Sequence, residues 1–410
     1  MPGACRDGIL LQVCFKNLFL ELGMLKKAAA VLVICASTAI CVGCLIGTSS
    51  HVLYASLPQS AQIVEYREDP NSGILTQLAT SPVTAGAGVQ SLAVHPTGKY
   101  LYAANAGEND ISFFLVEPGG QLEEQTPRTV VGTSPTLLVM DSAGKFLYVA
   151  NSGSQNISVF SIAPSSSSSI GGNLMPVGNA FQAGISPLNM KISPSGNFLY
   201  VTGASPQAGT PGYIEVLAIN TAVTAPASPL SIVAITRPGS SPYGLAISSN
   251  GNYLYTANFG DNTISEFTIN MTGSATSSGV PPGGLMPIAG SPIGETNTGP
   301  VSLLIDPSGT YLYVANQQSS GNVAGYTIGT GGALSLLTSS PYPTGAAPNF
   351  IASDPGGNFL FVGNLTKPVI EPFCLASKNL SCNSSPGAGS LTEVTKYPLV
   401  GPPTSIVISP

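Results

Sequence analysis

The chain contains 410 residues, with 47 Gly and 35 Pro, and only 8% of its residues carry a charge. The formal net charge is −6, from 13 Lys and Arg against 19 Asp and Glu, so no excess of basic residues is available for binding nucleic acid. A hydrophobic fraction of 43% excludes a disordered chain, and two histidines are too few for a histidine-rich metal site. We therefore expect a folded protein that uses no metal and no cofactor, with no nucleic acid among its partners.

The first elements along the chain are those of an export signal. Lys26 and Lys27 precede an apolar run over residues 28–46 that contains no charged residue. Gly43-Cys44 fits the small residue and the lipidated cysteine of a bacterial lipoprotein signal, so Cys44 is the predicted lipidation site. Ordinary cleavage nearby is one alternative. An uncleaved anchor is another, because the run is close to the length that spans a bilayer.

The leader begins at either Met1 or Met24, because Met24 opens a more conventional signal than Met1 does. We predict residues 1–50 as an N-terminal extension plus a signal or lipoprotein-type leader, and residues 51–410 as the exported body. The body is expected in the periplasm or on the cell surface. We expect it to be a monomer that meets the membrane only through its N-terminal anchor.

From about residue 51 onward, one unit recurs along the chain. An apolar strand is followed by a turn of the Pro-Ser-Gly-Asn type, by a strand of the Tyr-Leu-Tyr-Val-Ala-Asn type and by a third strand. The six copies of the turn and second strand are His95-Pro-Thr-Gly-Lys-Tyr-Leu-Tyr-Ala-Ala-Asn105, Asp141-Ser-Ala-Gly-Lys-Phe-Leu-Tyr-Val-Ala-Asn151, Ser193-Pro-Ser-Gly-Asn-Phe-Leu-Tyr-Val-Thr-Gly203, Ser248-Ser-Asn-Gly-Asn-Tyr-Leu-Tyr-Thr-Ala-Asn258, Asp306-Pro-Ser-Gly-Thr-Tyr-Leu-Tyr-Val-Ala-Asn316 and Asp354-Pro-Gly-Gly-Asn-Phe-Leu-Phe-Val-Gly-Asn364. A period of about 50 residues with four short strands per unit is typical of a β-propeller.

The two ends of the body complete a seventh copy. Val52-Leu53-Tyr54-Ala55 is a further Leu-Tyr strand, and it lacks an apolar strand before it. The C-terminal segment 403–410, Pro-Thr-Ser-Ile-Val-Ile-Ser-Pro, is the missing strand. The predicted fold is all-β: a seven-bladed β-propeller of four-stranded antiparallel blades, in which the C-terminal strand joins the N-terminal strands and closes the ring.

Two charged residues interrupt the pattern in the third copy. Lys191 replaces the small or aliphatic residue of the first strand, and Glu215 replaces a serine of the third strand. A charge in an apolar position is costly unless it is paired, so we predict that Lys191 and Glu215 interact directly or through water. The alternative is that each reaches solvent separately.

The same region offers the best candidates for a small-molecule site at a mouth of the channel. Arg237 and Tyr243 follow the third copy, at the start of the next one. The candidate catalytic residues are Lys191, Glu215 and Arg237, and Tyr243 is the candidate ligand-binding residue. Ordinary loop variation is the alternative interpretation of this region.

Only two of the seven cysteines, Cys374 and Cys382, lie outside the leader and within the body. A lone pair eight residues apart in an oxidising compartment predicts a local disulfide, with two free thiols as the alternative.

The repeats resemble the lactonase-type seven-bladed propellers and the related YVTN repeats. Tyr148-Val-Ala-Asn151 and Tyr313-Val-Ala-Asn316 differ from the YVTN motif by one residue, and the resemblance covers about residues 51–410. That family includes 6-phosphogluconolactonases, whose first strands often carry Gly-Pro-Arg-His. The resemblance implies that this Arg holds an anionic substrate and that this His serves acid–base chemistry.

The Arg-His pair of that family is missing from every copy in this chain. The corresponding residues are Gln90-Ser91, Thr136-Leu137, Leu188-Asn189, Tyr243-Gly244, Val301-Ser302, Asn349-Phe350 and Thr404-Ser405. We therefore expect an exported lactonase-like propeller that acts as a binding or surface module. Its expected partner is a cell-envelope protein or a small carbohydrate or lactone ligand. The alternative is a lactone hydrolase, similar to 6-phosphogluconolactonase, with a rearranged active site.

Overall fold

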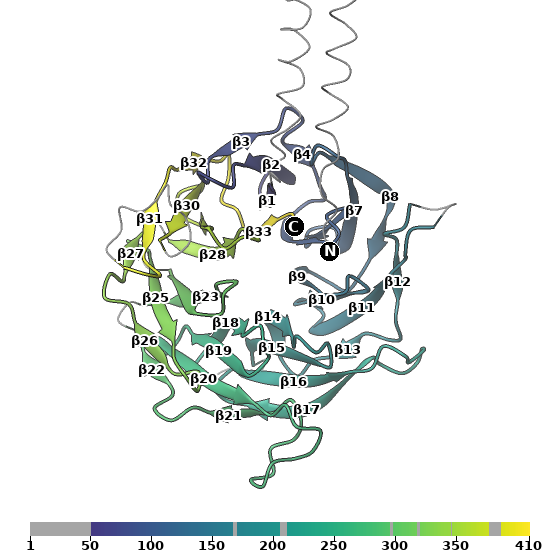
Figure 1. Ribbon diagram of the computed structural model, residues 1–410. Helices are drawn as coiled ribbons and strands as arrows, with labels where there is room; N and C mark the ends of the chain where they lie inside the picture. Colours follow the sequence, from purple (N-terminus) through teal and green to yellow (C-terminus); the bar gives the residue numbers. More distant parts are fainter. Residues whose placement is uncertain are drawn as a thin grey trace, which may run out of the picture. The chain divides into compact units, whose positions relative to one another are not determined.

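The computed structural model describes residues 51–166, 170–205, 211–295, 298–317, 320–345, 347–376 and 387–410. In these ranges the regular elements are strands, and they form seven antiparallel sheets, or blades, around a central axis (Figure 1). We number the blades 1 to 7 in chain order. All seven lie within one structural unit, Ser50–Pro410.

The first four blades contain the following strands. Blade 1 contains β1 (Val52–Leu57), β2 (Gln62–Glu68), β3 (Leu75–Gln77), β4 (Val83–Thr84) and β33 (Ile406–Ile408). Blade 2 contains β5 (Val89–Val94), β6 (Tyr100–Asn105), β7 (Asp110–Val116) and β8 (Leu122–Val130). Blade 3 contains β9 (Pro135–Met140), β10 (Phe146–Asn151), β11 (Asn156–Ile162), β12 (Leu174–Pro176) and β13 (Phe181–Gln182). Blade 4, the third sequence copy, contains β14 (Ser186–Ile192), β15 (Phe198–Ala204), β16 (Tyr213–Ile219) and β17 (Leu230–Thr236).

The last three blades repeat the same arrangement. Blade 5 contains β18 (Pro242–Ile247), β19 (Tyr253–Asn258), β20 (Thr263–Ile269), β21 (Leu285–Pro287) and β22 (Ile293–Gly294). Blade 6 contains β23 (Pro300–Ile305), β24 (Tyr311–Asn316), β25 (Asn322–Ile328), β26 (Leu334–Leu336) and β27 (Tyr342–Pro343). Blade 7 contains β28 (Pro348–Ser353), β29 (Phe359–Asn364), β30 (Val369–Leu375), β31 (Leu391–Glu393) and β32 (Tyr397–Pro398).

The outer strand of five blades is divided into two short pieces, where the sequence predicts one. In blade 5, for example, β21 and β22 both pair with β20. Between them the chain makes a turn, in which the Ser291 N–H donates to the Ile288 carbonyl, and Pro292 follows with no N–H to continue the ladder. Only blades 2 and 4 keep one continuous outer strand.

The ring closes through the last strand of the chain, as predicted. β33 pairs antiparallel with β1, which aligns Val407 with Tyr54, and so becomes the inner strand of blade 1. The backbone N–H of Val52 also donates to the Ser409 hydroxyl at 2.8 Å. The two ends of the body are therefore held in one sheet, and β33 gives blade 1 the inner strand that the other blades have.

Neighbouring blades are joined by packed side chains and by one recurring hydrogen bond. The second Tyr of the Tyr-Leu-Tyr motif is buried, and its hydroxyl donates to a glycine carbonyl in the following blade. The pairs are Tyr54 to Gly120, Tyr102 to Gly172, Tyr200 to Gly283, Tyr255 to Gly332 and Tyr313 to Gly389, at 2.6–2.8 Å. In three of these pairs the first aromatic residue of the motif packs on the same glycine: Phe198 on Gly283, Tyr253 on Gly332 and Tyr311 on Gly389. In these five blades the motif therefore fastens the next blade.

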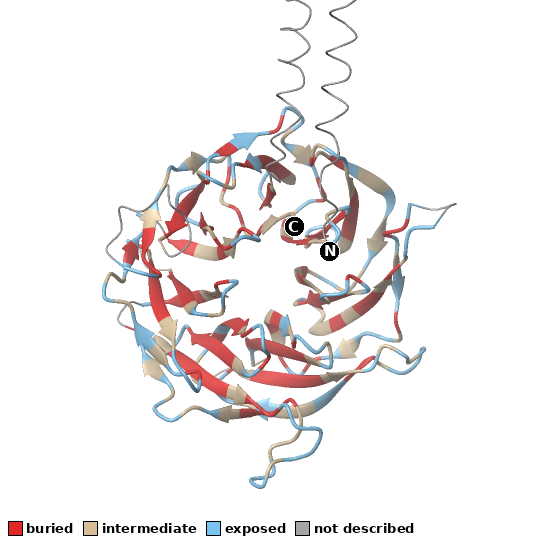
Figure 2. Ribbon diagram, in the orientation of Figure 1, coloured by how far each residue is buried: buried red, intermediate tan, exposed pale blue. Residues whose placement is uncertain are grey.

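The hydrophobic core lies between the blades. One cluster, for example, combines Tyr148 and Ile157 of blade 3 with Met190 and Leu199 of blade 4. Figure 2 shows buried residues along the inner and middle strands and exposed residues along the outer rim. The inner strands β5, β9, β14, β18, β23, β28 and β33 contact one another in sequence around the axis (Figure 1). Residues at equivalent positions on these strands therefore lie close together around the axis.

Candidate functional site

Six inner strands contain a β-bulge near their start, after the first residue in five of them and after the second residue in β14. The pairing register of β5 shifts between Val89 and Ser91, for example, and that of β28 between Pro348 and Phe350. We call the extra residues the bulge residues; they are Gln90, Thr136, Leu188, Tyr243, Val301 and Asn349. Bulges redirect side chains and are common at the rims of β-structures beside functional sites. This end of the inner strands is therefore the candidate site.

The bulge residues are all uncharged, and two of them have a buried oxygen without a partner. Tyr243 is 39% exposed, and Val301 is buried. The Asn349 side-chain amide donates to the Pro403 carbonyl at 3.0 Å, which leaves its Oδ1 buried with no hydrogen bond. The Thr136 hydroxyl is likewise buried and unpartnered. Buried polar atoms normally have partners, so these two oxygens each lack the hydrogen bond that is usual for a buried group.

Among the residues of the seven inner strands, Lys191 is the one that carries a charge. It lies on β14, where it pairs with Tyr200, and the equivalent residues pair with the equivalent aromatic residue in every blade. Lys191 is exposed to solvent and belongs to no ion pair among the described residues. Desolvation by the surrounding blades nevertheless lowers the pKa of its amine below the ordinary lysine value. A larger fraction of this amine is therefore neutral near pH 7 than for an ordinary lysine.

Glu215 is fully buried on β16, on the other side of the sheet from Lys191. The register aligns Met190, Val201 and Glu215 across three strands, whereas Lys191 aligns with Tyr200 and Val216. Residues aligned across a sheet share a face, and their neighbours along the strand point to the opposite face. The predicted direct interaction of Lys191 with Glu215 is therefore wrong. The repeat alignment located both residues but did not reveal this offset of one residue.

Glu215 is held instead by the connection that precedes blade 4. Its Oε1 accepts a 2.7 Å hydrogen bond from the Gly184 N–H, and its Oε2 is buried without a partner. Burial raises the pKa of this carboxyl, and the bond from Gly184 offsets only part of that effect. The Tyr213 hydroxyl donates to the Gly184 carbonyl at 2.9 Å, beside the carboxyl group.

Arg237 joins this group, and Tyr243 lies apart from it. The Arg237 guanidinium carbon lies 5.8 Å from the centre of the Tyr213 ring, in a cation–π contact. Tyr243 is a bulge residue whose carbonyl accepts a 2.6 Å hydrogen bond from the Thr202 hydroxyl. The structure thus brings Arg237 and Glu215 together around Tyr213, while Lys191 and Tyr243 lie on inner strands. Tyr213 carries no sequence signal beyond its place at the start of the third strand.

A second buried glutamate at the same repeat position was missed by the sequence analysis. Glu371 of β30 pairs with Val362, as Glu215 pairs with Val201 in blade 4. Glu371 is 1% exposed, and its Oε1 lies 3.1 Å from the Lys396 amine. Aligning the third strands of all copies would have found this residue. Because Glu371 is paired in this way, a buried carboxylate at this position is not by itself a sign of catalysis.

The comparisons with known proteins agree with this architecture. Residues 46–169 match the family model described as a lactonase, 7-bladed beta-propeller. The resemblance to the lactonase-type propellers is confirmed. A comparison with curated proteins finds no match.

Solved structures extend the likeness in fold over most of the chain. A Bacteroides fragilis protein proposed to be a 6-phosphogluconolactonase has a TM-score of 0.69 at 21% identity, covering 89% of this chain and 99% of that one. The periplasmic gluconolactonase of Pseudomonas aeruginosa has a TM-score of 0.68 at 18% identity, covering 88% and 99%. At such identities the likeness establishes the fold and not the activity.

Several sequence predictions concern residues outside the described ranges. Cys44 and the rest of the leader lie outside them, as does Cys382. Cys374 is 1% exposed and forms a disulfide, but its pairing with Cys382 stays a prediction. Among the described residues, no group of three or more His, Cys, Asp or Glu side chains is arranged to hold a metal ion. Nor does this part of the chain contain a helix long and apolar enough to cross a membrane.

Proposed function

We propose that this lactonase-type propeller is a binding module whose ligand site is the set of bulge residues. The observation that carries the proposal is their chemistry: all six are uncharged, and none is the Arg or His expected at this position of a lactonase. Without an Arg to hold an anion or a His to transfer a proton, the bulge residues lack the pair that the family uses for lactone hydrolysis.

The same residues favour a neutral, hydroxyl-rich ligand. Thr136 and Asn349 each offer a buried polar atom without a partner, and Tyr243 offers a partly exposed aromatic ring. Sites of this kind combine apolar contact with a few placed polar groups. We therefore propose a small carbohydrate or lactone as the ligand. Recognition of a cell-envelope protein through the same end of the ring is a possible further outcome of the binding experiment.

A lactone hydrolase with a rearranged site is the second candidate, and Lys191 is the observation in its favour. Desolvation lowers the pKa of its amine, which is the direction that a lysine acting as a general base or a nucleophile needs. It would have to act without Glu215, because that carboxyl lies on the opposite face of the sheet. The likeness to structures named as gluconolactonases gives this candidate a further reason to be tested.

One experiment separates the two candidates. The full chain, purified in a non-ionic detergent, is incubated in a pH-stat with sugar and aliphatic lactones, with and without Ca²⁺. A binding proposal predicts no proton release above buffer, together with saturable binding of one or more sugars or lactones by ligand-observed NMR. Thr136→Val should weaken that binding. Thr129→Val, on the outer strand β8, is the matched control and should leave it unchanged.

The outcomes assign the function. Lactone turnover that is lost in Lys191→Met supports the hydrolase. Turnover that survives both Lys191→Met and Glu215→Gln contradicts both the binding module and the hydrolase that uses Lys191. Absence of turnover and of saturable binding by folded protein contradicts a small-molecule role and directs the search to protein partners from the cell envelope.

We further propose that the propeller is exported and anchored through a lipid on Cys44. The supporting observation is the leader itself, with Lys26 and Lys27 before an apolar run that ends at Gly43-Cys44. Metabolic labelling with a palmitate analogue should modify the wild type and Cys41→Ser but not Cys44→Ser. Equal labelling of all three would contradict lipidation at Cys44.

A further inference from the structure

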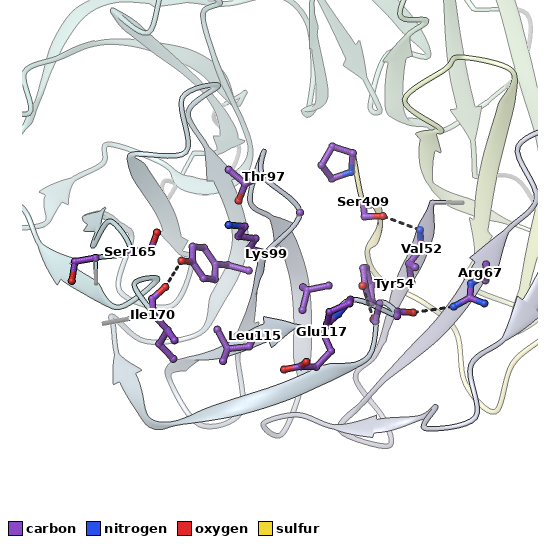
Figure 3. Close-up of a pocket in the computed structure, with 18 residues that line it drawn as sticks. Val52, Tyr54, Arg67, Thr97, Lys99, Leu115, Glu117, Ser165, Ile170 and Ser409 are labelled. Carbon is purple, nitrogen blue, oxygen red and sulfur yellow. Dashed lines mark hydrogen bonds between the residues drawn. The ribbon is translucent and has the colours of Figure 1, made fainter. Parts of the chain in front are cut away.

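A cavity of about 890 Å³ lies between blades 1 and 2, away from the bulge residues (Figure 3). Val52 of β1, the turn Thr97–Tyr100 and the β7–β8 hairpin line it, together with Ser409 next to β33. The turn Thr97–Tyr100 follows the last residue of β5, whereas the bulge of β5 lies at its first residues. The cavity and the candidate site above are therefore at opposite ends of the same inner strand.

The cavity lies where blade 1 departs from the repeat. In the other blades, the residue before the Leu-Tyr or Leu-Phe pair is aromatic: Tyr100, Phe146, Phe198, Tyr253, Tyr311 and Phe359. In blades 4 to 7 this ring covers a glycine of the following blade: Phe198 covers Gly283, Tyr253 covers Gly332, Tyr311 covers Gly389 and Phe359 covers Gly73. In blade 1 this residue is Val52, which contacts Gly120 with its methyl groups. Valine lacks the six-membered ring, so the space that the ring fills elsewhere is left open.

The side chains around this space combine positive charge with apolar surface. Lys99 and Arg67 line the cavity, and neither forms an ion pair with another described residue. The Arg67 Nη2 donates to the Gly119 carbonyl at 3.1 Å, which leaves further guanidinium N–H groups unused. Glu117 is the one carboxylate side chain in the lining. Two basic side chains therefore lie beside one acidic side chain, and Pro410, the last residue of the printed sequence, also lines the cavity.

The apolar part of the lining lies beside these charges. Leu115 of β7 and Ile170, which is 56% exposed, line the cavity together with Val52. The Tyr100 hydroxyl donates to the Ile170 carbonyl and so holds the connection that follows β11 against blade 2. The volume is within the range of pockets that bind small molecules.

We propose that this cavity is a binding site for a small amphiphilic anion, namely a phosphate or carboxylate group on a short apolar body. Lys99 and Arg67 hold the anionic group, and the apolar body lies in the space that Val52 leaves open. The ligand is either a soluble ester or acid or the head group of an acidic lipid, and both present the same chemistry to the site. This site does not depend on the function of the bulge residues.

The test is calorimetric titration of the full chain, in non-ionic detergent, with hexyl phosphate, hexanoate and soluble dihexanoyl phosphatidylglycerol. Hexyl phosphate or hexanoate alone identifies a soluble ligand, and preference for the phospholipid identifies a head group. We expect saturable binding at one site. Lys99→Gln and Arg67→Gln should each weaken it about threefold, and both together about tenfold, because partly exposed charges contribute modestly.

Two further variants decide whether the cavity is the site. Val52→Phe restores the side chain of the other blades and should abolish binding while the protein keeps its thermal unfolding midpoint within a few degrees. Lys145→Gln changes the lysine at the same turn position of the next blade, which does not line the cavity, and should bind as the wild type does. Saturable binding that is unchanged in folded Val52→Phe, or no saturable binding of any of the three probes by the wild type, would overturn the proposal.

Discussion

Tyr255 and Glu266 are cross-strand partners that together hold one hairpin of the following blade. The Tyr255 hydroxyl donates to the Gly332 carbonyl at 2.7 Å, and the Leu334 N–H, two residues further on, donates to the Glu266 carboxyl at 2.7 Å. Tyr54 and Glu65 hold the Gly120-Gln121-Leu122 hairpin in the same way. These buried glutamates are thus explained by blade-to-blade contact, without a catalytic role.

Tyr255→Phe is expected to destabilise the protein by about 1–2 kcal/mol, because it leaves the buried Gly332 carbonyl without its donor. The ring itself should still fit, since blade 7 has Phe361 at this position. Tyr253→Phe is the matched control, because the structure gives the Tyr253 hydroxyl no hydrogen bond, and it should cost less than about 0.5 kcal/mol. Urea unfolding of the two variants measures the difference; equal effects would contradict the role assigned to this bond.

Glu68 predicts a pH-dependent stability. It is fully buried, neither carboxyl oxygen has a hydrogen bond, and Asp354 and Asp69 add negative charge nearby. Burial, and then these two charges, raises its pKa from 4.5 to about 8. Because the folded-state pKa is raised, the folded protein favours the protonated acid. The contribution to stability is therefore fullest below pH 4.5 and declines as the pH rises toward 8.

Glu68→Gln should remove this decline, because the amide has nearly the same shape and cannot ionise. We expect the variant to match the wild type in stability near pH 4.5 and to exceed it near pH 8.5. The exposed Glu123→Gln is the control and should not change the pH profile. Parallel profiles for the wild type and Glu68→Gln in urea unfolding from pH 4.5 to 9 would refute the assignment.

The lowered pKa of Lys191 predicts an unusually reactive amine. Acylating reagents attack the neutral amine, so labelling of Lys191 should begin at lower pH than labelling of the exposed Lys145 in the same molecule. Mass spectrometry of peptides labelled with acetic anhydride across pH 6 to 11 measures both midpoints at once. A Lys191 midpoint at or above that of Lys145 would contradict desolvation of the amine.

The ion pairs of Lys396 predict that the buried Glu371 contributes more to stability through its pair than the exposed Glu393 does. Lys396 lies 3.1 Å from the buried Glu371 and 2.9 Å from Glu393, whose side chain is 40% exposed. Burial raises the pKa of Glu371, and Lys396 offsets part of that effect. Lys396→Met should cost about 1–3 kcal/mol, because it leaves a buried carboxylate unpaired, whereas Glu393→Gln should cost less than about 1 kcal/mol. Chemical unfolding at pH 7 compares them, and the reverse order would disprove this account.

The seven-bladed architecture could be predicted from the sequence because one unit repeats along the chain. Leu-Tyr strands at a regular spacing predicted the blades, and the unpaired segments at both ends predicted the closure that aligns Val407 with Tyr54. The absence of Arg and His from the bulge positions could also be read directly, because position in a repeat identifies equivalent residues without coordinates. The local pattern is sufficient for these conclusions because every blade packs against its neighbours in the same way.

Only the tertiary structure decided which face of a sheet each side chain occupies and where a cavity lies. The repeat alignment predicts that Lys191 and Glu215 interact, but the strand register places them on opposite faces of the sheet. A shift of one residue moves a side chain to the other face. Val52 looked like an ordinary member of its strand, yet its size matters only because Gly120 of the next blade lies against it. The sequence by itself determined the seven blades and their closure, since these follow from local pattern. Pairings and cavities were decided by contacts between residues distant in the chain.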